Sequence, residues 1–168
     1  MTLDEVNPKK GTYAAVRLSK ASTDALSEWA KANKIPNVLA AKKMHVTLLY
    51  SRRHCPNYVP QGKIDPAWLA NVKDKDVFMT RPTEGEPTRC LVLKIDCLTL
   101  FNRHLELMNE HSATYDFPLY TPHVSISYDI GDLDIWSLSE FEGELEIVEE
   151  YGEDLDLNWA VTKGEAKK

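Results

Sequence analysis

Cysteine and glycine are scarce in this chain, and long apolar runs are missing. Its 168 residues include three cysteines, an odd number with no Cys-x-x-Cys pair, which indicates neither a disulfide framework nor a zinc knuckle. The seven glycines are scattered, so a glycine-rich phosphate-binding loop is not expected. No apolar run is long enough for a membrane-spanning helix, and the first residues lack the basic and apolar parts of a signal peptide. We therefore expect a cytoplasmic protein without a membrane partner.

The excess of acidic residues limits the partners that the chain can have. Its formal net charge is −6, whereas a protein that binds a long nucleic acid usually carries a basic stripe, so no such polymer is expected. Basic residues gather around one segment, because Lys42 and Lys43 precede His45 and Arg52 and Arg53 follow it. These cations could draw a small anion into a pocket, or they could be a solvated strand end.

Two of the five histidines stand in matching segments. The segments His45-Val46-Thr47-Leu48 and His123-Val124-Ser125-Ile126 both have the order His, apolar, hydroxyl, apolar. Aliphatic and β-branched residues alternate with polar ones in each segment, which predicts a strand. Side chains of a strand alternate between its faces, so each histidine shares a face with the hydroxyl two residues later. Two pairs of this kind could hold one phosphodiester from both sides.

The sequence around these segments repeats as well. A shift of 78 residues, the difference between 45 and 123, lays one histidine on the other and superposes a predicted strand and a predicted helix that precede each. This order predicts a duplicated lobe with copies at about 11–51 and 89–129. We expect one two-lobed domain over residues 1–168, with flexible ends at 1–10 and 163–168.

Strands and helices alternate along the chain, which predicts an α+β fold. We expect a bilobal molecule of two related antiparallel sheets, flanked by helices, with the active-site cleft between the lobes. A strand is predicted over Arg89–Asp96, and residues 51–71 are expected to form a long connection with a short helical turn around Trp68. A helix is predicted over Leu98–His111. Its expected buried stripe has apolar residues at helical spacing, namely Leu98, Phe101, Leu105 and Met108.

Four further side chains are expected to lie outside the site. His104 and His111 share one side of the predicted helix, but no carboxylate or cysteine stands at a fitting position, so exposed polar residues are expected rather than metal ligands. Tyr50 and Tyr128 end the two histidine strands. Strand parity predicts that both face away from the histidines and into the core.

The paired histidine segments resemble the twin signature of the two-histidine phosphoesterase superfamily. Within it the chain is most similar to the phage anti-CBASS nucleases, from about Gly11-Thr12-Tyr13 through residues 45–51 and 122–128 to Trp159. The superfamily consists of two-lobed α+β enzymes that act on cyclic phosphates and on nucleotide or RNA phosphodiesters without metal. Its phage branch destroys the cyclic di- and trinucleotide alarm signals of bacterial defence. Ser125 stands where threonine is common, which keeps the hydroxyl and loses a methyl group.

The resemblance implies that His45 and His123 are the general acid and general base, in an order that stays open. In a 3′–5′ linkage of the 3′3′-cGAMP type, the base would remove the proton of the neighbouring 2′-hydroxyl and the acid would protonate the departing 5′-oxygen. Thr47 and Ser125 would donate hydrogen bonds to the non-bridging oxygens. A 2′,3′-cyclic phosphate would form first and then be opened by water, with no metal or cofactor.

Three residues are candidates for binding a cyclic oligonucleotide. Tyr13 on the first strand and Trp159 on the last could stack the bases, or both could belong to the core. Glu153, in a turn expected before the last strand, could accept a hydrogen bond from a base edge, or it could be a surface charge. No obligate protein partner is evident.

Two other functions remain open at this point. One is a 2′,3′-cyclic phosphodiesterase or RNA-end processing enzyme of the same superfamily, against which the acidic charge counts mildly. The other is a nucleotide-sequestering protein that binds without turnover. A pure binder has no need for a duplicated histidine and hydroxyl on one face, whereas an acid–base enzyme does.

Overall fold

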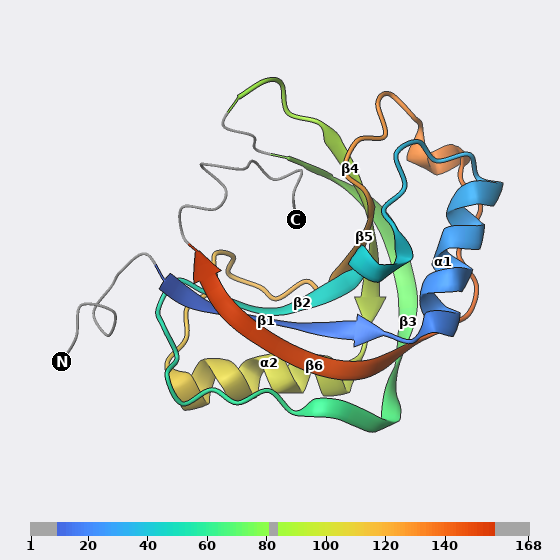
Figure 1. Ribbon diagram of the computed structural model, residues 1–168. Helices are drawn as coiled ribbons and strands as arrows, with labels where there is room; N and C mark the ends of the chain where they lie inside the picture. Colours follow the sequence, from blue (N-terminus) through green and yellow to red (C-terminus); the bar gives the residue numbers. More distant parts are fainter. Residues whose placement is uncertain (1–9, 81–83, 157–168) are drawn as a thin grey trace.

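The strands of the protein form one closed antiparallel sheet (Figure 1). The computed structural model describes residues 10–80 and 84–156. Its strands are β1 (Lys10–Leu18), β2 (His45–Ser51), β3 (Gly62–Met79), β4 (Arg89–Asp96), β5 (His123–Ser127) and β6 (Glu144–Asp156). Its helices are α1 (Lys20–Ala32) and α2 (Leu98–His111), with short 3-10 turns η2 (Ala41–Lys43) and η3 (Ile135–Ser137). The strands follow the order β1, β2, β5, β4, β3, β6 around the ring, and β6 pairs again with β1.

This architecture confirms the predicted α+β class. In place of two separate sheets, the strands form one sheet, because the long β3 and β6 link its two halves: β3 pairs with β4 and β6, and β6 pairs with β1. On the other side of the ring, β2 and β5 meet through the pair Val46 and Val124. The two histidine strands are therefore neighbours. Each follows the same order of elements, β1-α1-β2 in one half and β4-α2-β5 in the other.

The strand β3 is much longer than the sequence indicated. Residues 62–71 belong to this strand, and Trp68 pairs with Ile147 of β6 instead of forming a helical turn, so that prediction was wrong. Pro66 lies where the ladder to β6 is interrupted, between Lys63 and Trp68. A proline has no N–H to donate to the ladder, so it fits at a position where the ladder is interrupted. The strand can therefore run through a proline-containing segment that the sequence indicated to be a loop.

The strand β6 is also continuous where the sequence predicted a turn. Glu153 lies inside β6 and pairs with Tyr13 of β1, so its expected place in a turn was wrong. The preceding residue of the strand is Gly152, and a larger residue would not fit there, because a Cβ atom would lie 2.6 Å from the Tyr58 ring. Glycine in a strand often marks such a close approach rather than a turn.

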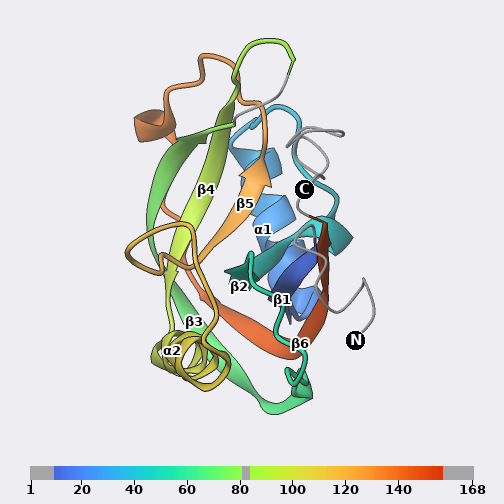
Figure 2. The same cartoon turned by 90° about the vertical axis from the view of Figure 1, so that its left-hand side faces the viewer.

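The two faces of the sheet have different roles, and we call them the core face and the histidine face. The core face carries the fully buried apolar side chains, including Ala14, Val16, Val46, Leu48, Leu91, Leu93, Val124, Ile126, Leu145 and Ile147. The histidine face is the opposite one, which carries His45 and His123. Figure 1 shows both helices on the outer side of the curved sheet, and in Figure 2 α2 is viewed along its axis beneath the sheet while α1 lies behind β5.

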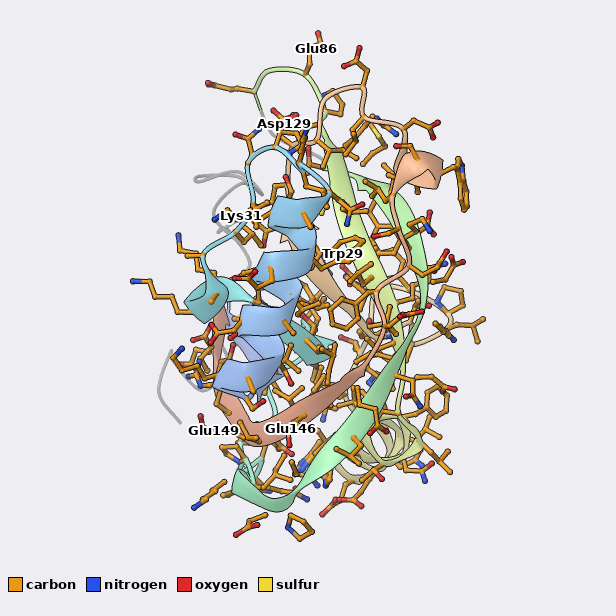
Figure 3. The ribbon with its side chains drawn as sticks, turned by 90° about the vertical axis from the view of Figure 1, so that its right-hand side faces the viewer. Trp29, Lys31, Glu86, Asp129, Glu146 and Glu149 are labelled. Atoms are coloured by element: carbon orange, nitrogen blue, oxygen red, sulfur yellow. The ribbon has the colours of Figure 1, made fainter. Side chains whose placement is uncertain are left out.

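Helix α1 covers the core face with an apolar stripe. Its N-cap is Ser19, whose side chain accepts a hydrogen bond from the N–H of Ser22. Trp29 and Lys31 leave the helix on opposite sides (Figure 3), and Trp29 is buried in the core. No helix in residues 10–80 and 84–156 is long and apolar enough to cross a membrane.

Helix α2 has the predicted bounds but buries a different face. Its buried side chains are Leu100, His104 and Leu107, whereas Leu98 is 72% exposed and Phe101 and Leu105 are also exposed. The predicted exposure of His104 was therefore wrong, and so was the predicted burial of Leu98, Phe101 and Leu105, whereas Met108 is partly buried and packs against the core. Two apolar stripes with the same helical spacing run along this helix, and the spacing alone does not tell which one meets the sheet. The buried His104 fits the core because its Nδ1 bonds to the Leu48 carbonyl at 2.8 Å.

Candidate active site

Both histidine pairs lie together on one face of neighbouring strands. The pair of Val46 with Val124 places His45 opposite Ser125 and Thr47 opposite His123, since residues on either side of an antiparallel pair face each other across the strands. These four polar side chains are half-buried, while the alternating apolar residues of both segments are fully buried on the core face. The alternation that the sequence predicted is present in the structure, and it brings His45, Thr47, His123 and Ser125 into one group, which we call the quartet.

The two imidazoles are anchored in the same way. His45 Nδ1 lies 2.9 Å from the carbonyl oxygen of Lys43, and His123 Nδ1 lies 2.8 Å from the carbonyl oxygen of Thr121. A carbonyl oxygen only accepts, so Nδ1 carries a proton and donates it in both rings. The Nε2 atom of each ring is then the one that takes up or gives a proton. These anchors are backbone atoms two residues before each histidine, and side-chain patterns do not reveal them.

The environment of His123 favours the neutral imidazole. Burial lowers the pKa of His123 most, the bond to the Thr121 carbonyl raises it, and the positive charges of His45 and Lys94 lower it further. The net pKa lies below its ordinary value of 6.5. Lys94 is the direct partner of His123 in the ladder between β4 and β5, and it forms a 2.8 Å ion pair with Asp76 of β3. A neutral imidazole at pH 7 can act as a base, and the effect of His45 shows that the two rings interact.

Of the two predicted ligand-binding residues that the structure describes, Tyr13 and Glu153, Tyr13 contacts the quartet directly. Its hydroxyl is 2.9 Å from Thr47 Oγ1, and its ring meets the His45 ring edge-on with centroids 6.4 Å apart. Burial raises the pKa of Tyr13 well above its ordinary value, so the phenol is protonated at neutral pH. Tyr13 thus links the Thr47 hydroxyl of the quartet to the neighbouring strand β1.

Of the other two predicted ligand-binding residues, only Glu153 lies in the part of the chain that the structure describes. Glu153 pairs with Tyr13 in the ladder between β1 and β6, and its negative charge contributes to the raised pKa of Tyr13, so its carboxylate lies near the phenol. On the same strand, Tyr151 lies under the guanidinium of Arg17, 3.9 Å from the ring centroid. Trp159 lies outside the described residues.

Tyr50 lies on the histidine face, although strand parity predicted that it faces the core. The register between β1 and β2 shifts by one residue after Thr47, where Leu48 has no partner in β1. This is a β-bulge, and it reverses the face of the residues that follow. Tyr50 consequently pairs with Tyr13, and their rings meet edge-on with centroids 6.3 Å apart.

Tyr128 returns to the histidine face in the same way. The register between β4 and β5 shifts after Ser125, where Ile126 has no partner in β4. Ser127 is buried on the core side, and the next residue, Tyr128, comes beside Cys90. Burial raises the pKa of Tyr128 most, and the neighbouring Cys90 thiol adds to the rise. Cys90 also donates a weak 3.9 Å hydrogen bond to Ser125 Oγ, which places it beside the quartet.

The basic residues around β2 do not all stay available for an anion. Arg52 forms a two-fold bond to Asp116, from Nε at 2.9 Å and from Nη2 at 3.0 Å. Lys42 and Lys43 of η2 are exposed. Among the described residues, no group of three or more His, Cys, Asp or Glu side chains could hold a metal ion. Two ion pairs flank the quartet: Arg17, the partner of His45 in the ladder between β1 and β2, binds Glu149, and Lys94, the partner of His123, binds Asp76.

Known proteins resemble this chain over most of its length. Residues 10–162 match the model of the family described as "Anti-CBASS protein Acb1". The anti-CBASS protein Acb1 of Vibrio phage KVP40 is 35% identical over 159 residues, which cover 95% of this chain and 97% of that protein. The corresponding protein of Enterobacteria phage T4 is 35% identical over 155 residues, covering 89% and 91%. Among solved structures, Escherichia coli LigT complexed with phosphate has the same fold, with a TM-score of 0.59 and 13% identity over 86% of each chain.

Proposed function

Because the chain belongs to the anti-CBASS protein Acb1 family, within the two-histidine phosphoesterase superfamily, we propose that it is a phosphodiesterase that destroys a cyclic oligonucleotide signal. The substrate is a cyclic di- or trinucleotide with 3′–5′ linkages, of the 3′3′-cGAMP type. Its cleavage in the cytosol of the host bacterium counters CBASS immunity. The observation that carries the proposal is the pair of imidazoles on neighbouring strands, each held at Nδ1 by a backbone carbonyl and each left with Nε2 for proton transfer.

The lowered pKa of His123 supports its role as the general base. His123 Nε2 takes the proton of the 2′-hydroxyl, the 2′-oxygen attacks phosphorus, and the bond to the 5′-oxygen breaks. His45 gives its proton to that 5′-oxygen. The product is a linear oligonucleotide with a 2′,3′-cyclic phosphate, which water opens after the two histidines exchange roles. General acid and base groups typically contribute about 10²–10⁴-fold each to the rate.

The hydroxyls of the quartet stabilise the charge that builds up on the phosphate. Thr47 and Ser125 donate to the non-bridging oxygens in the transition state. The Tyr13 phenol is protonated at neutral pH and can donate to Thr47 Oγ1, which leaves the threonine proton for the phosphate. One solved structure with this fold, Escherichia coli LigT, is a complex with phosphate, in keeping with a ligand that contains phosphate.

Base recognition uses the residues that extend from the quartet towards β6. Tyr13 stacks one base, for which aromatic contacts typically supply about 1–3 kcal/mol. Glu153 accepts a hydrogen bond from a base edge, and Trp159 stacks with a base, as the resemblance implies. No protein partner is needed for these contacts or for the proton transfers.

Cleavage of 3′3′-cGAMP in the presence of EDTA tests this function. The intact protein should convert it to a linear dinucleotide, resolved by mass, because the imidazoles carry both proton transfers. His45→Ala and His123→Ala should each lose at least about 100-fold in rate. His111→Ala, a change to a histidine of α2 away from the quartet, is the control and should keep the activity.

The same experiment separates the other functions. Ligand that is bound and protected but unchanged would identify a sequestering protein. Activity on 2′,3′-cyclic mononucleotides or RNA ends, with no binding of 3′3′-cGAMP, would identify a housekeeping phosphodiesterase. Near-normal activity of either histidine variant would contradict the acid–base assignment.

A further inference from the structure

The similarity between the two histidine motifs extends beyond the histidine and the hydroxyl. Both end in a tyrosine five residues after the histidine, His45 with Tyr50 and His123 with Tyr128. In both, the residue directly after the hydroxyl is the extra residue of a β-bulge. Without the bulges, both tyrosines would lie in the core. With them, both lie on the histidine face, and bulges beside active sites commonly re-aim a side chain in this way.

The bulges are held in place by donors from outside the strand pair. The bonds run from Tyr120 Oη to the Thr47 carbonyl (2.6 Å), from His104 Nδ1 to the Leu48 carbonyl (2.8 Å) and from the Leu39 N–H to the Ile126 carbonyl (2.9 Å). The rings of His104 and Tyr120 stack with centroids 4.0 Å apart. The bulge before Tyr50 is thus held by two partners and the bulge before Tyr128 by one, and none of these partners belongs to the two motifs.

The backbones of the two tyrosines lie at opposite ends of the quartet. Val46 and Val124 pair at its centre, and each tyrosine follows its own valine by four residues, in opposite directions because the strands are antiparallel. At the usual rise of a strand, each lies roughly 10–13 Å along the chain from that pair. Tyr50 is beyond Thr47, at the end of His123, and Tyr128 is beyond Ser125, at the end of His45.

We propose that Tyr50 and Tyr128 bind the two bases that flank the scissile phosphate, one at each end of the quartet. This inference rests on the proposed function. A phosphodiester held at the quartet has one nucleoside on each side, and a half-buried aromatic ring at each end offers a surface on which a base stacks. Because His123 takes the proton of the 2′-hydroxyl, Tyr50 contacts the base of the nucleotide that supplies this hydroxyl, and Tyr128 contacts the base of the departing nucleotide.

Ligand binding to variants that cannot turn over tests this assignment. In the His45→Ala background, Tyr50→Met and Tyr128→Met should each raise the dissociation constant of 3′3′-cGAMP about 5- to 150-fold, the loss expected for one stacked base. Tyr50→Phe and Tyr128→Phe keep the ring and should stay within about threefold of the parent. The ligand 2′,3′-cyclic AMP holds only the nucleotide on the side of the attacking hydroxyl. Its binding should weaken in Tyr50→Met and stay unchanged in Tyr128→Met.

The control is Trp136→Met, a change to an exposed aromatic side chain on η3. It should leave both dissociation constants unchanged. In the otherwise intact enzyme, the methionine variants should raise KM more than they lower kcat, whereas support of Tyr13 and Thr47 alone would lower kcat with KM unchanged. Should a methionine variant unfold in a thermal scan, Tyr50→Leu and Tyr128→Leu make the same comparison.

The outcomes distinguish this inference from the proposed function. If the unmodified protein neither binds nor cleaves 3′3′-cGAMP, the proposed function fails. If the unmodified protein binds and cleaves it while the methionine variants bind within twofold of their His45→Ala parent, the proposed function stands and the assignment of the tyrosines is overturned. Equal weakening of 2′,3′-cyclic AMP by both methionine variants would overturn the placement of one base at each end.

Discussion

Replacing Glu150 by alanine should destabilise the protein far more than the same change one residue earlier. Glu150 is buried on the core side of β6, where Arg103 of α2 binds it through Nε at 2.9 Å and Nη2 at 3.0 Å. The Tyr58 hydroxyl donates to the same carboxylate at 2.6 Å. Glu150→Ala leaves the guanidinium of Arg103, whose side chain is only 11% exposed, without its buried counter-charge. Removing one partner of a buried ion pair typically costs about 3–5 kcal/mol.

The neighbouring Glu149 supplies the matched control. It pairs with Arg17 at 2.8 Å, but both side chains are about half exposed. Exposed pairs contribute about 0–1 kcal/mol, so Glu149→Ala should change the free energy of unfolding by no more than that. Urea denaturation followed by circular dichroism measures both values. A loss below about 1 kcal/mol for Glu150→Ala, equal to that of Glu149→Ala, would refute the view that this buried pair holds α2 against β6.

Three further predictions concern the site. Because the pKa of His123 lies below 6.5 in the folded protein, the unfolded state binds more protons between that pKa and 6.5, so this imidazole should make the free energy of unfolding fall as pH drops below about 6.5. The acid limb of kcat/KM follows the folded pKa and should lie below pH 6.5, and Lys94→Met, which removes a charge that lowers this pKa, should move the limb to higher pH. Tyr13→Phe removes the bond to Thr47 and should lower kcat/KM about 10-fold in a steady-state assay; an unchanged value would remove Tyr13 from the positioning of Thr47. Tyr120→Phe leaves the Thr47 carbonyl without its 2.6 Å donor and should cost about 1–3 kcal/mol in urea denaturation, with no loss if water replaces the hydroxyl.

Local patterns in the sequence predicted the strands of the site well. The strand β4 and the helix α2 have the predicted bounds, and both histidine strands begin at the predicted residues. Each of these elements has an apolar pattern that a single segment carries on its own. The face shared by His45 and Thr47, and by His123 and Ser125, followed from alternation alone and is present in the structure.

Features that depend on two segments at once could not be read from the sequence. The bulges that turn Tyr50 and Tyr128 are differences in register between neighbouring strands, and a single strand does not carry that information. The path of β3 through Pro66 depends on where its partner β6 leaves a gap. The buried face of α2 depends on which of two apolar stripes meets the sheet.

The most direct test of the central claim is a single-turnover measurement on 3′3′-cGAMP whose 5′-bridging oxygens are replaced by sulfur. A thiolate leaves without being protonated, since thiols have a pKa of about 8.5, so this substrate needs a general base but no general acid. On it, His45→Ala should recover to within about 10-fold of the unmodified enzyme, while His123→Ala should stay about 10²–10⁴-fold slower. If neither variant recovers, the two imidazoles do not act as acid and base on one phosphorus.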